Sequence, residues 1–361
     1  MFKYHSHFVT TIGNMDLKKI CYSIIISTLP FFASAQTGDA TVSVNNDDHK
    51  EMVMSNDKKN KPAANEAAVV TPLTKRRIIN GSSKAIVKNV PTLNSDKNDF
   101  SPVSYQNGVL YCSSVKKTSK KNKDDDADED INLRYALFDS LGNLTKPIAF
   151  GHRANSKTNE GPSCFSANQD TLYLSRNASK GGKVIFNKNG KATLKIYIKT
   201  KDSLGNFIGD DILPFESENY SYCHPTLSAN GDKLYFASNM PGGFGGMDLW
   251  VTRRMKDGTW SQPINLGPRI NTSKNEVFPF MSESGTFYFS SDGITGGKGG
   301  YDLYRIDIEN RTARTFPMGE PFNTEFDDFG IMFLPKNETK GYFSSNRKGG
   351  TGGDDIYEFE F

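Results

Sequence analysis

Four acidic residues each stand five places after an asparagine, at the end of a short polar turn. They are Asp99, Glu160, Glu276 and Asp328, which follow Asn94, Asn155, Asn271 and Asn323. Carboxylates brought together from several turns are ligands that a hard cation such as Ca²⁺ prefers, and they also attract basic peptides. Two interpretations stay open. Either the acids surround one mouth of a central channel, with Glu160, Glu276 and Asp328 as the metal ligands, or each caps its own turn or pairs with a neighbouring Lys or Arg.

A second set of acids follows three glycine-rich turns, at residues 242–246, 296–300 and 349–353. These turns lack the Lys-Ser/Thr ending of a phosphate loop, and a strand rather than a helix is expected after each one. The acids are Asp248, Asp302 and Asp355, spaced 54 and 53 residues apart. We expect them to accept backbone N–H bonds that lock the turns, because catalysis needs one asymmetric site and these residues recur three times.

Other catalytic signals are weak. His152 and His224 stand outside any metal-binding spacing, and the sequence has no G-x-S-x-G elbow. The carboxylates that glycoside hydrolysis would need are present only as the repeated acids, with no unique pair among them. The sequence therefore predicts a protein without catalytic residues and without a cofactor. Only the binding of Ca²⁺ stays open. A hydrolase acting on glycans or lactones is the alternative.

Three cysteines follow the N-terminal leader described below: Cys112, Cys164 and Cys223. An odd number cannot pair completely within one chain, and their spacings match no metal motif. We expect buried thiols in strands, and a single disulfide among them stays open.

The elements that carry these residues repeat along the chain. Residues 225–251, 279–306 and 330–359 each read as strand, turn, strand, glycine-rich turn, Asp and third strand. A repeat of about 50 residues built from short strands is typical of a β-propeller blade. Two earlier copies are longer. We expect their extra residues in a charged, solvated loop at 116–130 and in a replaced glycine turn at 180–195.

The number of blades follows from the strands. Fourth strands are expected at 144–150, 207–214, 260–266 and 313–318, whereas the fifth repeat reaches residue 361 without one. A ring left open there would expose bare strand edges. We therefore expect residues 85–90 to pair with 356–361. The predicted fold class is all-β: a five-bladed propeller of four-stranded antiparallel blades, closed by the N-terminal strand.

The residues before the propeller read as a secretory leader and a tether. A basic pair, Lys18 and Lys19, precedes an apolar run at 20–32 and an Ala-Ser-Ala site, which predicts a signal peptide over 1–35, with translation starting at Met1 or Met15. The run is too short to span a membrane. Residues 36–83 are predicted to be a disordered polar linker before a propeller at 84–361. The net charge of +3, mostly in the leader, gives no electrostatic reason to bind nucleic acid.

The stretches YFASNMPGGFGGMDLW (residues 235–250) and WSQPINLGPRINTSKNEVFPFMSESGTFYFSSD (260–292) resemble the WD40-like repeat of TolB-type propellers. More narrowly, they are similar to the version found in envelope proteins of Bacteroidetes, in which the propeller accompanies an OmpA-type domain or type IX secretion machinery. We expect this protein to lack the OmpA-type domain. The resemblance implies an exported binding or scaffold module in the periplasm, at the periphery of the outer membrane or outside the cell. Its expected partner is an envelope protein, a peptide or a glycan.

Overall fold

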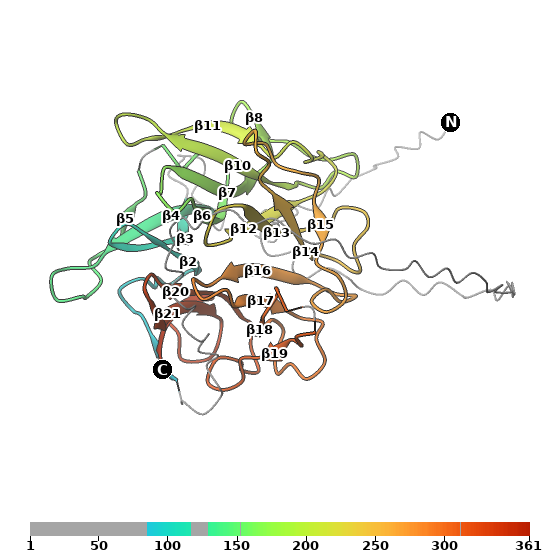
Figure 1. The fold of residues 1–361 in the computed structure, drawn as a ribbon. Helices are drawn as coiled ribbons and strands as arrows, with labels where there is room; N and C mark the ends of the chain where they lie inside the picture. The colour runs from blue at the N-terminus through green and yellow to red at the C-terminus, as the bar shows by residue number, and fades with distance from the viewer. Residues whose placement is uncertain (1–84, 117–128, 152, 311) are drawn as a thin grey trace, which may run out of the picture. The chain divides into compact units, whose positions relative to one another are not determined.

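The computed structural model describes residues 85–361 except 117–128, 152 and 311. These residues form an all-β fold of five four-stranded antiparallel sheets, arranged as a five-bladed β-propeller, and one additional two-stranded sheet. In Figure 1 the inner strands β2, β6, β12, β16 and β20 gather in the middle of the ring. The predicted leader and linker, 1–35 and 36–83, lie outside the described residues. The described part of the chain contains no helix long and apolar enough to cross a membrane.

Each blade is a meander of four hydrogen-bonded strands. The inner strands are β2 (Asp99–Tyr105), β6 (Glu160–Phe165), β12 (Tyr222–Leu227), β16 (Glu276–Met281) and β20 (Asp328–Leu334). The second strands are β3 (Gly108–Lys116), β7 (Thr171–Asn177), β13 (Lys233–Ser238), β17 (Phe287–Ser291) and β21 (Asn337–Ser345). The third strands are β4 (Glu129–Leu137), β10 (Leu194–Lys201), β14 (Asp248–Arg253), β18 (Asp302–Ile306) and β22 (Asp355–Glu360). The outer strands are β5 (Ile148–Ala149), β11 (Phe207–Ile212), β15 (Ile264–Asn265), β19 (Phe316–Pro317) and β1 (Ile86–Asn89).

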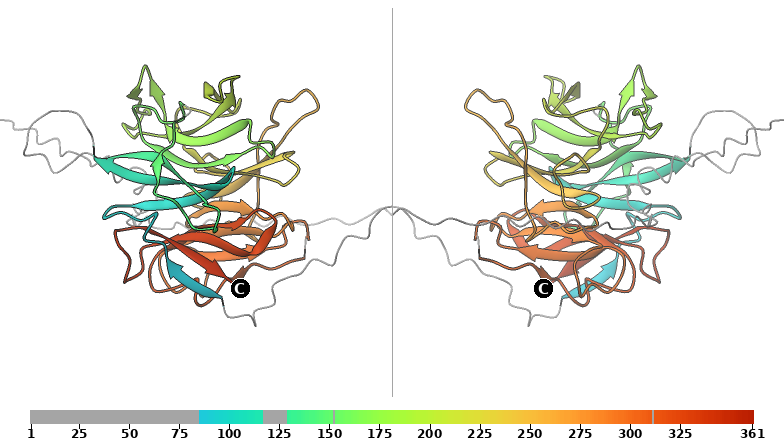
Figure 2. Two further views of the ribbon diagram at one scale, coloured as in Figure 1. Left: turned by 90° about the vertical axis from the view of Figure 1, so that its left-hand side faces the viewer. Right: turned by 90° about the vertical axis from the view of Figure 1, so that its right-hand side faces the viewer.

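The ring is closed by the strand that precedes the first blade, as predicted. β1 pairs antiparallel with β22, in a register that runs from Ile86 opposite Glu360 to Asn89 opposite Tyr357. The side views show this strand, in cyan, beside the red strands of the last blade (Figure 2). The last blade therefore takes its fourth strand from the other end of the propeller, and neither end of the ring keeps a bare edge.

The outer strands are shorter than predicted. β5, β15 and β19 each contain two residues, where the sequence suggested seven, seven and six. Each lies next to or includes a proline, at Pro147, Pro263 and Pro317. Proline has no N–H to give to the ladder, so pairing stops beside it. In the second blade, the extra residues include the two-stranded sheet of β8 (Ser179–Lys180) and β9 (Lys183–Val184).

The charged block of the first blade also differs from its prediction as a loop over 116–130. β3 continues to Lys116 and β4 begins at Glu129, so the two ends of the block pair with each other in the ladder. The connecting residues 117–128 lie outside the described part of the chain.

The hydrophobic core lies between neighbouring blades. One cluster joins Ile196 of the second blade to Phe236 and Trp250 of the third, and another joins Leu303 of the fourth to Phe343 of the fifth. Because both faces of a blade are covered, a second strand such as β13 reads as a nearly continuous buried run rather than an alternating one. Cys112, Cys164 and Cys223 are buried in this core, and no disulfide joins them.

Candidate functional site

The four repeated acids open four of the inner strands and are fully buried. Asp99, Glu160, Glu276 and Asp328 all have 0% of their surface exposed. Each carboxylate accepts a hydrogen bond from the backbone N–H of the residue four places before it. Thr272 shows the pattern, since its backbone N–H and its hydroxyl both donate to Glu276, at 2.7 Å each. The backbone N–H groups of Ser95, Ser156 and Thr324 donate to Asp99, Glu160 and Asp328.

The second strand of the blade contributes further donors to two of these acids. The Ser291 hydroxyl donates to Glu276 at 2.7 Å, and the Ser345 hydroxyl donates to Asp328 at 2.6 Å. Arg347 also forms an ion pair with Asp328 at 2.6 Å. These contacts place each carboxylate within the hydrogen-bond network of its own blade.

The second blade has Arg176 where the others have a serine opposite the acid. Burial raises the pKa of Glu160 to about 7, because the hydrogen bonds from Ser156 and the charge of Arg176 offset only part of the loss of water. Burial likewise raises the pKa of Asp99 and of Glu276.

The four acids therefore lie in four separate turns. None of them lines the axial pocket described below. Within the described residues no group of three His, Cys, Asp or Glu side chains is placed to hold a metal ion. The structure does not bring Glu160, Glu276 and Asp328 together.

The asparagines that precede these acids bind across to the previous blade. Asn271 accepts from the backbone N–H of Leu249 at 2.8 Å and donates to the carbonyl of the same residue at 2.9 Å. Asn323 makes the same pair of bonds with Leu303, and the other two asparagines make them with residues of β4 and β22. An asparagine amide can do this because it carries one acceptor and one donor side by side.

At the junction of the second and third blades the asparagine is absent, and Glu216 takes its place. Its carboxylate accepts from the backbone N–H of Ile196 at 3.2 Å, the position that the other blades give to an asparagine oxygen. Burial raises the pKa of Glu216 and lowers that of the neighbouring Lys195. Sequence analysis identified the four asparagines of the other junctions but not the glutamate at this one.

The acids after the glycine-rich turns accept bonds from those turns. Asp248 accepts from the backbone N–H groups of Phe244 at 2.6 Å and Gly245 at 3.2 Å. Asp302 and Asp355 have the same contacts, with the N–H groups of residues 298 and 299 and of residues 351 and 352. All three are buried, so they present no carboxylate to a ligand.

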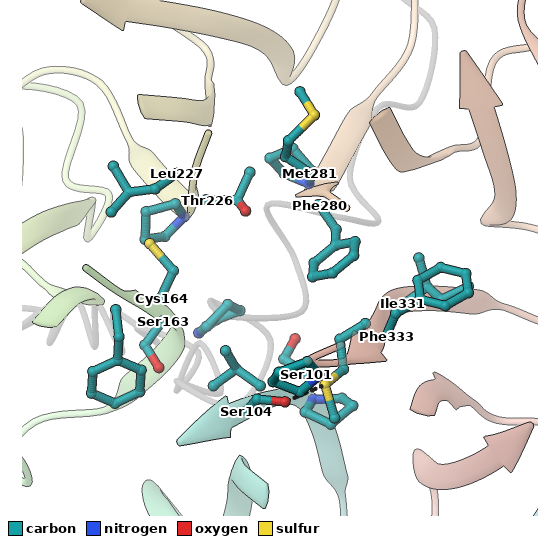
Figure 3. Close-up of a pocket in the computed structure, with 18 of the residues that line it drawn as sticks. Ser101, Ser104, Ser163, Cys164, Thr226, Leu227, Phe280, Met281, Ile331 and Phe333 are labelled. Atoms are coloured by element: carbon teal, nitrogen blue, oxygen red, sulfur yellow. Dashed lines mark hydrogen bonds between the residues drawn. The ribbon is translucent and has the colours of Figure 1, made fainter. Parts of the chain in front are cut away.

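The structure contains a pocket on the propeller axis that sequence analysis missed. It has a volume of about 520 Å³, within the range of small-molecule sites, and all five inner strands line it. Figure 3 shows Ser104, Ser163, Thr226 and Phe280 around a common space. The lining runs from the middle of each inner strand to the hairpin turn that follows it, and Glu283 and Glu338 are the acidic residues in it.

A β-bulge interrupts each inner strand at the inner end of this pocket. In each blade, two residues of the inner strand are left out of its pairing with the second strand. The first of these two residues has a positive φ at Ser101 (53°), His224 (54°), Phe278 (50°) and Gly330 (64°). The sequence did carry a signal, because Pro102, Pro162, Pro225 and Pro279 recur at this position, and a proline inside a strand marks a bulge or an edge.

No family model and no curated protein matches this chain. Solved structures do. TolB from Acinetobacter baumannii aligns over 75% of this chain with 12% identity and a TM-score of 0.39, and the alignment spans just over half, 56%, of the TolB chain. The endo-arabinase from Bacteroides thetaiotaomicron aligns over 76% of this chain and 96% of its own, with 13% identity and a TM-score of 0.45. The α-L-arabinofuranosidase from Lactobacillus brevis aligns over 75% and 92%, with 12% identity and a TM-score of 0.44. Likeness at this level is one of fold and implies no activity.

Proposed function

We propose that this chain is an exported, non-catalytic binding module of a bacterial cell envelope, and that the axial pocket is its binding site. The observation that carries the proposal is the pocket itself, a space of about 520 Å³ walled by all five blades. A closed ring of blades holds such walls rigidly, so little order has to be gained when a ligand enters.

The chemistry of the pocket favours binding over hydrolysis. Retaining and inverting glycosidases place two carboxyl groups on either side of the bond that they cut, about 5–9.5 Å apart. The repeated acids that could have supplied such a pair are fully buried and bonded within their own blades. The two acids that do line the pocket, Glu283 and Glu338, each accept a backbone N–H from the neighbouring blade's turn, from Lys336 and Ser284.

The place of action is proposed from the sequence. The basic pair, apolar run and Ala-Ser-Ala site of the leader support export, and the WD40-like repeat resembles that of Bacteroidetes envelope propellers. The proposed location is the periplasm or the periphery of the outer membrane, and the proposed partner is an envelope protein or one of its peptide or glycan ligands.

Two experiments on the purified mature protein test the proposal. Affinity capture from an envelope extract should retain a defined partner. Incubation with arabinan, other glycans and lactones, with and without Ca²⁺, should give no turnover. Turnover that Glu160→Gln or Glu276→Gln abolishes would assign the protein to the hydrolases and overturn the proposal.

A further inference from the structure

The bulges at the inner end of the axial pocket hold their residues in a backbone conformation that L-amino acids avoid. Ser101, His224 and Phe278 all have φ near +50°, which costs each of them free energy compared with glycine. Strained residues of this kind, and bulges in general, collect at functional sites, where surrounding contacts keep them in place. Those contacts come from neighbouring blades.

Two of the contacts are equivalent and one is different. The N–H of Ser101 donates to the Ser344 hydroxyl, and the N–H of His224 donates to the Ser175 hydroxyl, both at 2.9 Å. Phe278 belongs to the fourth blade, and the neighbouring third blade has Ala237 at the position of these two serines. The N–H of Phe278 therefore lacks a hydroxyl acceptor. It donates instead to Nδ1 of His224 at 3.3 Å.

The hydrogen bond from Phe278 determines which ring nitrogen of His224 carries the proton. An imidazole nitrogen that accepts a hydrogen bond carries no proton, so the proton of the neutral ring lies on Nε2. The ring stacks on Phe278 with centroids 3.9 Å apart, and burial lowers the pKa of His224 to about 3. His224 therefore stays neutral at physiological pH. Its Nε2–H belongs to a side chain that lines the pocket and is a donor there.

A polar group in the bulge of the first blade is buried without a partner in the described part of the chain. The Ser101 hydroxyl is buried without a hydrogen bond among the described residues, and Ser101 as a whole is 7% exposed. Figure 3 shows it at the edge of the common space. Buried polar atoms are nearly always hydrogen-bonded, so the unpaired Ser101 hydroxyl indicates a missing partner, and the His224 N–H is a donor that the same partner can use.

The rest of the pocket limits what that partner can be. Its walls carry apolar side chains, among them Val103, Leu227, Phe280 and Ile331. No lining residue is a lysine or arginine, and the two acidic ones, Glu283 and Glu338, belong to the turn after β16 and to β21, not to the bulges. A charged group of a ligand that reached the bulges would lose its hydration without gaining a counter-ion.

We infer that the axial pocket takes an uncharged amphipathic ligand, whose neutral amide, carbonyl or hydroxyl head bonds Ser101 and His224 while its apolar body lies against the walls. This inference rests on the proposed binding function and names the ligand class for the same site. The Ser101 hydroxyl can donate and accept, and the His224 N–H donates, so a carbonyl oxygen satisfies either group.

The test uses three probes of equal length: hexanamide, hexanoate and hexylammonium, measured by ligand-observed NMR titration at pH 7. Hexanamide should bind with a Kd of about 1 mM, as expected for a ligand of this size, and each charged probe at least tenfold more weakly. Ser101→Ala should weaken hexanamide binding about fivefold, the value of one hydrogen bond. Ser140→Ala is the matched control, because Ser140 is exposed in the turn between β4 and β5 and does not line the pocket, and it should change binding less than twofold.

Three results would overturn the inference: no binding of hexanamide, equal binding of a charged probe, or equal effects of the two serine substitutions. Circular dichroism and thermal unfolding of both variants exclude misfolding as the cause of a loss. The proposed function fails separately. If the protein captures an envelope partner but shows no selectivity among the probes, only the ligand class is wrong, whereas the absence of any captured partner contradicts the binding module itself.

Discussion

Replacing Asn271 by alanine should destabilise the propeller far more than an ordinary asparagine substitution. Asn271 is 2% exposed and joins the fourth blade to the third through both backbone groups of Leu249, a residue with no exposed surface. Its amide also donates to Asn265 at 2.8 Å. Asn271→Ala removes the three bonds together and provides no substitute.

The expected cost follows from which partners stay buried. The N–H of Leu249 would be left without a partner, and an unsatisfied buried polar group costs about 1–3 kcal/mol, whereas its C=O would still accept from the N–H of Leu266 at 3.0 Å and would lose one of two hydrogen bonds. Asn265 is half-buried, and its side-chain oxygen still accepts from the N–H of Gly267 at 2.8 Å. One orphaned N–H and one lost hydrogen bond together should lower the free energy of unfolding by about 2–4 kcal/mol, a large fraction of the total for a typical domain.

Urea unfolding measures this loss directly. Asn143→Ala is the matched control, because Asn143 is exposed in a hairpin turn and its side chain reaches only Asp139, at 3.5 Å. The control should change the free energy of unfolding by less than about 0.5 kcal/mol. A transition midpoint for Asn271→Ala equal to that of the control, at an unchanged m-value, would refute the claim that asparagine side chains join the blades.

Three further predictions concern the closure of the ring, its turns and its pH dependence. Val87→Asp should lower the free energy of unfolding by about 2–3 kcal/mol, because Val87 packs on the core cluster of the last blade, while Lys88→Ala, on the exposed face of the same strand, should be close to neutral in urea unfolding. Gly352→Ala should cost more than Gly349→Ala in the same measurement, because a Cβ at residue 352 would lie 1.9 Å from a backbone oxygen of the first blade, whereas residue 349 (φ +88°) has open space and only its backbone conformation is strained. Since the pKa of Glu160 rises to about 7 on folding, the folded state binds its proton more tightly, and stability should fall by up to about 3 kcal/mol as the pH rises from about 4.5 to 7. Urea unfolding across this range should show a slope that Glu160→Gln flattens, and an equal slope in the variant would refute the assignment.

The sequence was sufficient for the architecture because blade periodicity is a property of the chain. The recurrence of Asp248, Asp302 and Asp355 set the repeat, and the missing fourth strand of the last repeat implied that the N-terminal strand closes the ring. Strand lengths were less predictable. The outer strands stop at prolines, whose effect depends on which N–H groups face the neighbouring strand.

The candidate site was harder to predict, because side-chain direction is set by packing. The spacing of Asn271 and Glu276 identified residues that matter, but spacing alone cannot tell a carboxylate that faces a channel from one that faces its own turn. The pocket was missed for a related reason. It depends on five bulges placed at one level, and the recurrent prolines that accompany them, such as Pro225 and Pro279, were present in the sequence but were not used.

The central claim, that this propeller works by binding through its axial pocket, is tested most directly by filling the pocket. Thr226→Trp places a bulky ring into the space from β12, and Ser163→Trp does so from β6. Ile264→Trp, on an outer strand and 60% exposed, is the control for added aromatic surface. Quantitative capture of the envelope partner by these folded variants should fall at least tenfold for both pocket substitutions and stay unchanged for the outer one. Undiminished capture by Thr226→Trp and Ser163→Trp would contradict the account.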